Sequence, residues 1–157
     1  NYGDRRDLRV DGAPIGREIS EAEVPLPWLP EPGSGSIIII IATDAPLLPY
    51  QCERLAQRAT VGLGRVGGIG HNGSGDIFLA FATGNHIPYN AQIPTDLCYL
   101  PNRMMNPLFY ATVEAVEEAI LNALTAADTL TGFQGRTAHA LPLERLQALL
   151  AGRRILG

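Results

Sequence analysis

Five consecutive isoleucines at positions 37–41 constrain the fold of this chain more than any other segment. Side chains branched at Cβ favour β-strands, and an apolar run without alternation predicts a strand that is buried on both faces. Directly before this run lies Gly33-Ser34-Gly35-Ser36, whose glycines tolerate distorted backbone conformations. We therefore expect Ser36 at the head of a rigid, buried strand, where a reactive group is held in place.

A serine at this junction is suited to act as a nucleophile. Its hydroxyl could attack the preceding carbonyl and break the Gly35–Ser36 bond, which would leave a free α-amine beside the hydroxyl. Such an amine serves as the local base in N-terminal-nucleophile hydrolases. An alternative stays open, because Gly-Ser segments are usually linkers and apolar runs usually form core strands.

The remaining pattern predicts one domain in which helices and strands are mixed. Helices are expected, from apolar residues at helical spacing, over residues 47–63, 107–127 and 143–151. A second buried strand is expected over residues 77–82, and an Asp-Gly turn predicts a hairpin over residues 8–16. Proline-containing stretches predict irregular connections over residues 20–36 and 85–105.

The composition restricts the class of partner. The 157 residues carry 12 Lys and Arg against 16 Asp and Glu, a net charge of −4, without a basic cluster. This argues against a nucleic acid or an anionic membrane and favours small polar or peptidic substrates. No apolar run approaches the ~20 residues that span a bilayer.

The cysteines and histidines do not indicate a metal site. Cys52 and Cys98 lack the spacing of metal ligands, so we expect unpaired thiols, no metal and no cofactor, in a cytoplasmic protein. His71, His86 and His139 are expected to be surface or capping residues.

Two glycine-rich motifs precede the second predicted strand. The spacing Gly62-x-Gly64-x-x-Gly67 matches the dinucleotide-binding fingerprint, but it closes a helix instead of opening one, so nucleotide binding is not expected. Ser74 and Asp76 share the turn Gly73-Ser74-Gly75-Asp76. In this turn Asp76 could orient Ser74, and Ser74 could hydrogen-bond the nucleophile. A solvated turn is the alternative interpretation.

These residues carry a resemblance to a known family. The segment from Gly35 to Leu47, with the Ser74 turn at a spacing of 38 from Ser36, resembles the nucleophile region of the DmpA-type aminopeptidases. This group is peptidase family S58, the L-aminopeptidase/D-esterase and β-peptidyl aminopeptidase enzymes. Residues 1–3 and 10–17 resemble the end of the family's α-subunit, so the similarity covers essentially the whole chain.

The resemblance implies an α+β fold, a four-layer αββα sandwich, of which this chain is expected to be the C-terminal part. It implies a precursor that cleaves itself between Gly35 and Ser36 into an α-chain and a β-chain that stay associated. Residues 1–35 would be the end of the α-subunit with its linker, and residues 36–157 the β-subunit. The expected partners are the α-subunit from the same precursor, further copies of the αβ unit in a homo-oligomer, and a small peptide or an amino-acid amide or ester as substrate.

Carried over residue by residue, the resemblance makes Ser36 the nucleophile, Ser74 the second serine, Asp76 its acidic partner and Asn1 an oxyanion-hole amide. The implied activity is that of a serine aminopeptidase that forms an acyl-enzyme on Ser36. The proton of Ser36 would pass to its own α-amine or to Ser74 backed by Asp76. Two rivals stay open: a self-cleaving acyltransferase of the ornithine-acetyltransferase type, for which a threonine nucleophile would be expected, and a truncated, non-enzymatic interaction module.

Overall fold

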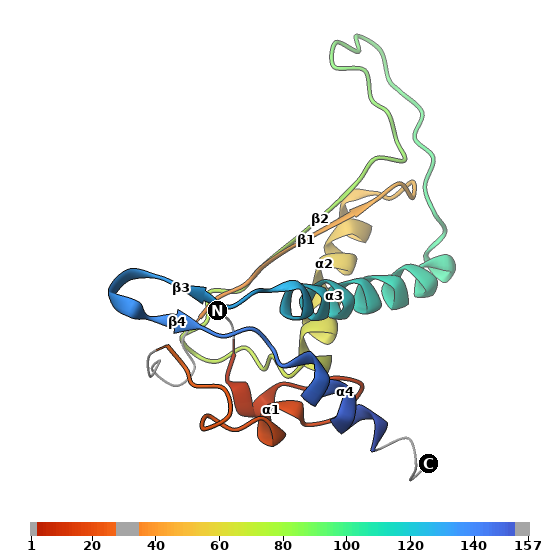
Figure 1. The fold of residues 1–157 in the computed structure, drawn as a ribbon. Coiled ribbons are helices and arrows are strands. Elements are labelled where there is room, and N and C mark those ends of the chain that lie inside the picture. The colour runs from red at the N-terminus through yellow and green to blue at the C-terminus, as the bar shows by residue number, and fades with distance from the viewer. Residues whose placement is uncertain (1–2, 28–34, 153–157) are drawn as a thin grey trace.

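The computed structural model describes residues 3–27 and 35–152, and it mixes helices with short strands (Figure 1). The elements are η1 (Arg5–Asp7), α1 (Ile15–Glu18), β1 (Ile38–Thr43), α2 (Pro49–Arg65), β2 (Ile77–Ala82), η2 (Asn102–Met104), α3 (Asn106–Ala126), β3 (Leu130–Thr131), η3 (Phe133–Gly135), β4 (Thr137–Ala138) and α4 (Leu143–Ala151). The predicted strand over 77–82 and helix over 143–151 are confirmed with the same bounds. The other two predicted helices are confirmed with ends displaced by one or two residues.

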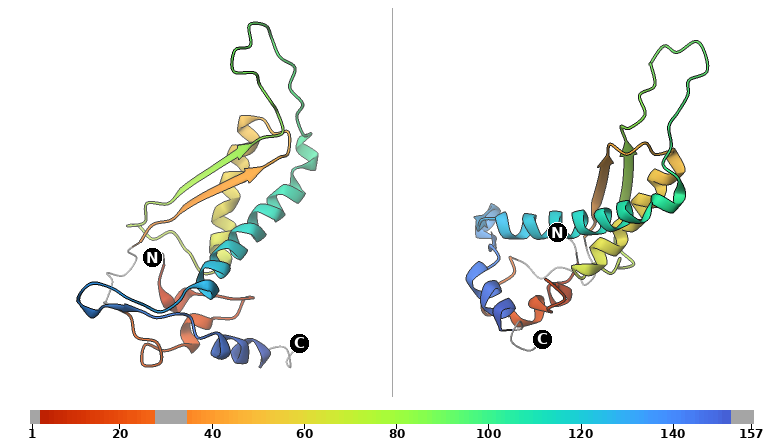
Figure 2. Two further views of the ribbon diagram at one scale, coloured as in Figure 1. Left: turned by 45° about the horizontal axis from the view of Figure 1, so that its top comes forward. Right: turned by 90° about the vertical axis from the view of Figure 1, so that its right-hand side faces the viewer.

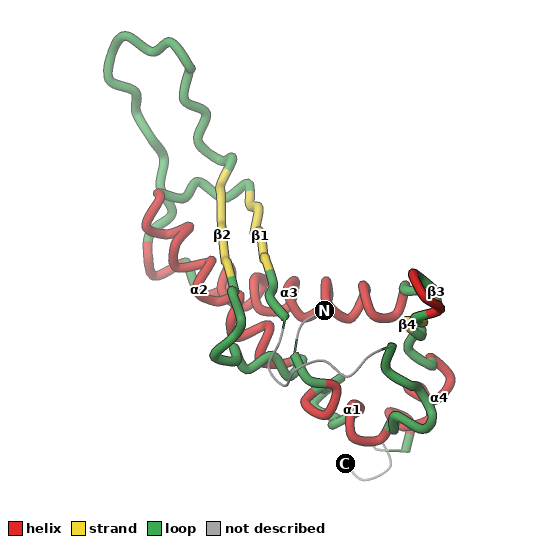
Figure 3. The backbone as a smooth tube through the Cα atoms, turned by 90° about the vertical axis from the view of Figure 1, so that its left-hand side faces the viewer, coloured by secondary structure: helices red, strands yellow, loops and turns green. Residues whose placement is uncertain are grey.

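β1 and β2 are parallel neighbours that are joined by α2 (Figure 3). Their register places Ile38 beside Ile77 and Thr43 beside Ala82. Because the strands are parallel, both begin at the same edge of the sheet. The residues just before the two strands therefore meet, and Ser36 lies next to the turn at 73–76.

One face of the strand pair is covered and the other is open. α2 packs against the inner face, and α3 packs against α2 (Figure 2). The large outer-face side chains, between 46% and 67% exposed, are Ile38, Ile40, Ile77, Leu79 and Phe81. The predicted burial of the isoleucine strand on both faces is therefore wrong for this structure. Within residues 3–27 and 35–152, no second layer covers the outer face.

The core that α2 forms with the sheet and with the segment before α3 contains one buried glutamine. Gln51 is fully buried; its side-chain oxygen accepts a hydrogen bond from the Leu48 N–H at 3.0 Å, and its Nε2 donates to the Leu100 carbonyl at 2.7 Å. These bonds connect the start of α2 to the segment that precedes α3. Cys52 lies in this core, where burial raises the pKa of its thiol, while Cys98 is exposed and both cysteines are unpaired.

Apolar residues between positions 10 and 24 pack against the C-terminal helix α4 (Figure 1). The predicted hairpin is confirmed at its turn, where Val10 and Ala13 pair across an Asp-Gly step whose two residues have positive φ. The expected second strand is instead the short helix α1, from which Ile15 packs with Leu146 of α4 in one apolar cluster. None of the described helices is long and apolar enough to cross a membrane.

A long irregular loop between β2 and α3 projects away from the rest of the molecule (Figure 1). The Asn85 side chain closes its base by donating to the Cys98 carbonyl at 2.8 Å and accepting from the Cys98 N–H at 3.0 Å. The predicted irregular connection over 85–105 is confirmed, with η2 as its one short helical turn. This loop follows the carboxyl end of β2, so it lies at the opposite end of the strands from Ser36.

Gly67 allows the N-terminal segment to pack against the loop after α2. Its φ is +99°, and a Cβ at this position would overlap the carbonyl oxygen of Asp7. We expect Gly67→Ala to lower the free energy of unfolding by about 3 kcal/mol, through backbone strain and overpacking. Gly64→Ala is the matched control: a Cβ there meets nothing within 4 Å, so this helical substitution should raise stability by up to about 1 kcal/mol. Urea unfolding of both variants in the full-length protein, followed by circular dichroism, tests this, and equal effects would contradict the proposed packing.

Candidate active site

Ser36 lies two residues before β1, with its side chain exposed at the edge where both parallel strands begin. Gly35, immediately before it, has a φ of +111°, a conformation that side chains disfavour. The sheet holds the following backbone, since the Ile77 N–H donates to the Ile37 carbonyl at 3.0 Å. The serine is thus fixed on its C-terminal side by the strand pair.

The turn before β2 delivers a main-chain donor to this serine. The Ser74 N–H donates to the His71 carbonyl at 2.8 Å, which closes the turn. The Gly75 N–H then donates to the Ser36 Oγ at 3.0 Å. A Cβ on Gly75 would lie 3.3 Å from that oxygen, so glycine permits this close approach.

Ser74 and Asp76 form a tight side-chain pair in the same turn. The two oxygens, Ser74 Oγ and Asp76 Oδ1, are 2.5 Å apart, a distance typical of a hydroxyl bonded to a charged acceptor. Ser74 Oγ also lies 2.9 Å from the carbonyl oxygen of Gly35. This pair is partly buried, whereas Ser36 is exposed.

The structure therefore brings together three of the four predicted site residues: Ser36, Ser74 and Asp76. Asn1 lies outside the described residues. Besides Asp76, the Ser74 hydroxyl contacts the Gly35 carbonyl, which lies next to the serine that was expected to receive its hydrogen bond. The Gly75 amide was not among the predicted site residues, although the parallel pairing of the two strands places position 75 opposite position 36.

The His71 side chain contacts the N-terminal segment, although its carbonyl closes the Ser74 turn. His71 Nε2 is 3.7 Å from Asp4 Oδ2, and Asp4, Asp7 and His71 form the one group of three potential metal ligands in the described part of the chain. Arg6 contacts the carboxylates of both Asp4 and Asp7, at 3.4 and 3.8 Å. A guanidinium in that position competes with any cation, so the cluster is better explained as an ion-pair network.

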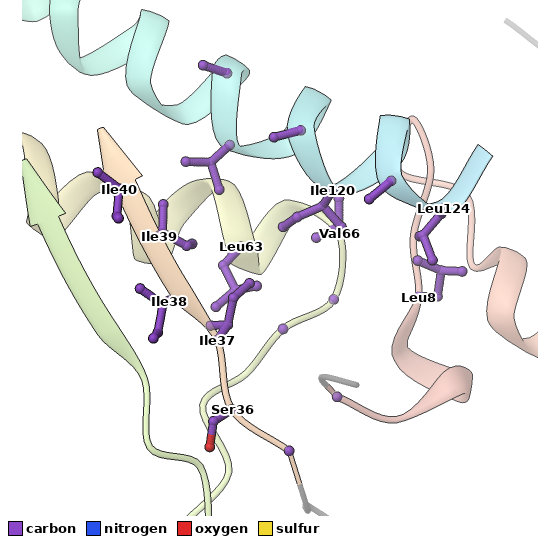
Figure 4. Close-up of a pocket in the computed structure, with 18 of the residues that line it drawn as sticks. Leu8, Ser36, Ile37, Ile38, Ile39, Ile40, Leu63, Val66, Ile120 and Leu124 are labelled. Carbon is purple, nitrogen blue, oxygen red and sulfur yellow. The ribbon is translucent and has the colours of Figure 1, made fainter. Parts of the chain in front are cut away.

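An open apolar groove begins at Ser36 and extends along β1 (Figure 4). Its volume is about 970 Å³. The walls come from β1, from the apolar side of α3, including Ile120 and Leu124, and from the N-terminal segment at Arg5 and Leu8. The edge of β1 that has no partner strand among the described residues is thus flanked by apolar surface from a helix.

The chain matches a known family of peptidases. The model of peptidase family S58 matches residues 1–138. A β-peptidyl aminopeptidase, BapA, from Sphingosinicella microcystinivorans is 45% identical over 166 aligned residues, which cover 96% of this chain and 41% of that protein. The chain thus spans about two fifths of the length of this curated relative.

Solved structures are also similar to this chain. The PH0078 protein from Pyrococcus horikoshii OT3 is 45% identical and superposes with a TM-score of 0.85, over 100% of this chain and 41% of its own. The L-aminopeptidase D-Ala-esterase/amidase from Ochrobactrum anthropi is 35% identical with a TM-score of 0.83, over 100% of this chain and 42% of its own. That enzyme is described as a prototype for the serine aminopeptidases and as a new variant among the Ntn hydrolase fold.

Proposed function

Because the chain belongs to peptidase family S58, we propose that it carries the nucleophile of a self-processing serine aminopeptidase, and that Ser36 is this nucleophile. The predicted α+β fold is confirmed by the solved relatives, one of which is a variant of the Ntn hydrolase fold. The reaction proposed for the whole protein is release of N-terminal amino acids from small peptides, amino-acid amides or esters.

One observation carries this proposal: the Gly75 N–H donates to Ser36 Oγ at 3.0 Å, while the Ser74–Asp76 pair lies in the same turn. A nucleophilic hydroxyl needs a fixed position and a neighbouring group that can take its proton. The main-chain donor fixes the oxygen and favours the build-up of negative charge on it. A hydroxyl and a carboxylate in the adjacent turn supply a route for the proton.

Self-processing would proceed at the Gly35–Ser36 bond. Ser36 Oγ forms a bond to the Gly35 carbonyl carbon, the hydroxyl proton passes to the Ser36 nitrogen, and the carbon–nitrogen bond breaks. The product is an ester between Gly35 and Ser36, which water hydrolyses to a Gly35 carboxylate and a Ser36 that bears a free α-amine. The φ of +111° at Gly35 is compatible with this step, because glycine lets the backbone adopt such a conformation next to the reacting bond at little steric cost.

Peptide hydrolysis would then use the same oxygen. Ser36 Oγ attacks the first amide carbonyl of the substrate and forms an acyl-enzyme, from which water releases the amino acid. The new α-amine is partly unprotonated near neutral pH, so it can accept the hydroxyl proton, and the Ser74–Asp76 pair is the second acceptor. We also propose, from the resemblance to the family, that the Asn1 side-chain amide donates to the substrate oxyanion.

The partner proposed for this chain is the preceding part of the same precursor. Cleavage would assign residues 1–35 to the α-subunit and residues 36–157 to the β-subunit. The groove along β1 and the exposed outer face of the strand pair support this, because both are apolar and adjacent to the nucleophile. These surfaces are suited to the two further layers of an αββα sandwich, and assembly of such αβ units into a homo-oligomer completes the proposal.

A double-mutant cycle on Ser74 and Asp76 tests the proton route. We expect Ser74→Ala and Asp76→Asn each to reduce kcat/KM toward an amino-acid p-nitroanilide by about 100-fold or more, since proton transfer contributes 10²–10⁴. The double variant should be at most about tenfold worse than the poorer single variant, because the two residues act as one unit. Rates are normalised to the cleaved fraction, which intact mass measures. If the losses of kcat/KM in the two single variants add in free energy in the double variant, the turn has only a structural role.

A further inference from the structure

The projecting loop between β2 and α3 exposes an apolar surface that the described part of the chain does not cover. Its large apolar side chains, each at least 45% exposed, are Ile87, Tyr89, Ile93, Leu97 and Tyr99. Asp96 is the one Asp, Glu, Lys or Arg between positions 83 and 101. We call residues 85–99 of this loop the arm. An apolar surface with so little charge resembles the centre of a protein–protein interface.

The sequence of the arm has a regular alternation. All five large apolar side chains occupy odd-numbered positions from 87 to 99, and the even-numbered positions between them carry Pro, Asn, Gln, Pro, Asp and Cys. Alternation of this kind is typical of an extended segment that buries one side. Within residues 3–27 and 35–152, this segment pairs with no strand. The pattern therefore indicates a partner outside the described residues.

The arm is held in place at its base and near its tip. The Asn85 side chain makes two hydrogen bonds to the backbone of Cys98, at 2.8 and 3.0 Å. Just beyond the base, the Leu100 N–H donates to the Pro46 carbonyl at 2.9 Å. The Ala91 N–H donates to the Pro88 carbonyl at 3.2 Å and closes a turn. A segment that is ordered before it binds loses less conformational entropy on binding.

The position of the arm separates it from the surfaces proposed for the preceding part of the precursor. That part joins the chain at residue 1, and Gly3 lines the groove that begins at Ser36. The arm follows the carboxyl end of β2, so it lies at the opposite end of the strands, and it extends beyond them (Figure 2). This placement favours a second αβ unit as the partner of the arm.

The exposed area of the arm is large enough for a stable contact. A buried aromatic side chain covers about 150–250 Å², so the five side chains, with their exposed fractions, present on the order of 700 Å². A receiving surface would bury a similar area. The total of about 1,400 Å² lies within the range of about 1,200–2,000 Å² that is typical of specific protein–protein interfaces.

We propose that the arm joins αβ units to one another, because the arm of one copy docks on the assembled αβ unit of a second copy. This inference rests on the homo-oligomer of the proposed function and assigns the segment that forms the contact. The large groove of the described residues is assigned to the preceding part of the precursor, so the receiving surface belongs to the assembled unit. Copies of residues 1–157 in isolation are therefore not joined through the arm.

The double substitution Tyr89→Ser and Ile93→Ser tests the proposal in the full-length, cleaved protein. It removes two of the most exposed apolar side chains of the arm, and truncation of such anchors has the largest effects on binding. We expect the dissociation constant between αβ units to rise at least about 100-fold, measured by sedimentation equilibrium. Hydrolysis of an amino-acid p-nitroanilide per αβ unit should stay within about twofold of the wild type, because the arm is remote from Ser36.

Two further variants of the arm serve as controls. Asn90→Ser with Gln92→Ser alters polar positions of the same arm and should leave the dissociation constant unchanged within about twofold. Asn85→Ala keeps every apolar side chain but removes the bonds to Cys98, so it should weaken association by about tenfold through the loss of a preformed arm.

Three results would overturn the inference. If the Tyr89→Ser and Ile93→Ser variant sediments as the wild type does, the arm is not the contact. If its αβ unit fails to form or is insoluble, the preceding part of the precursor covers the arm. If the wild type sediments as a single αβ unit, the contact does not exist. Failure of the proposed function is seen separately, as a wild type that neither cuts before Ser36, by intact mass, nor hydrolyses the p-nitroanilide.

Discussion

Ser36→Ala is expected to leave the precursor entirely uncut and to reduce peptide hydrolysis to the background rate. The substitution removes the oxygen that would attack the Gly35 carbonyl and, later, the substrate carbonyl, while the strand that holds position 36 is unchanged. Intact mass should show one species for the variant and two chains for the wild type. N-terminal sequencing of the smaller wild-type chain should read Ser-Ile-Ile-Ile.

Two neighbouring substitutions control this result. Ser34→Ala changes a second serine of the same Gly-Ser segment and should cleave normally. Ser36→Cys retains a nucleophile, so it should cleave at a reduced but measurable rate. A mature chain that begins at Ser34, or normal cleavage of Ser36→Ala, would remove Ser36 from the mechanism.

The meeting of Ser36 with the Ser74 turn could be predicted because it depends on local patterns. An isoleucine run, a helical spacing and a second apolar run predict strand, helix and strand, and such a unit places the two strands in parallel. Everything that precedes both strands then gathers at one edge of the sheet. What the pattern could not supply was the hydrogen bonding there. The contact of Ser74 with the Gly35 carbonyl depends on the backbone conformation at Gly35, which side-chain chemistry does not encode.

Burial of the isoleucine strand could not be predicted from this chain alone. Apolarity on both faces indicates that both faces are covered in the final assembly, but it does not indicate which segment covers them. The described residues provide a cover for the side that carries Ile39 and Ile41 only, through α2. The short helix α1 was missed for a similar reason, because Ile15 is held by Leu146 of α4, far away in the sequence.

Residues 1–157 expressed alone are therefore expected to be insoluble or to self-associate. The outer face of the strand pair exposes five large apolar side chains, each about half exposed or more. Burying the exposed part of each would stabilise the protein by about 1 kcal/mol, or about 5 kcal/mol together, which is comparable to the whole stability of a small domain. An uncovered apolar surface of this kind drives association. Co-expression with the preceding part of the precursor should give a soluble and active particle, as light scattering and p-nitroanilide hydrolysis would show.

Substitutions that introduce a charged pair on the outer face would distinguish association through this face from general misfolding. Ile40 and Leu79 are directly opposite each other in the register, at 61% and 53% exposure. The double substitution Ile40→Lys and Leu79→Glu places opposite charges across the strands, where they attract. It should make residues 1–157 monomeric in isolation and should prevent assembly with the preceding part of the precursor, because two charges would then be buried at the contact. Unmodified residues 1–157 could instead prove monomeric, cooperatively folded and inactive toward aminoacyl amides. The outer face would then need no cover, and a self-contained interaction module would explain this chain better than a peptidase subunit.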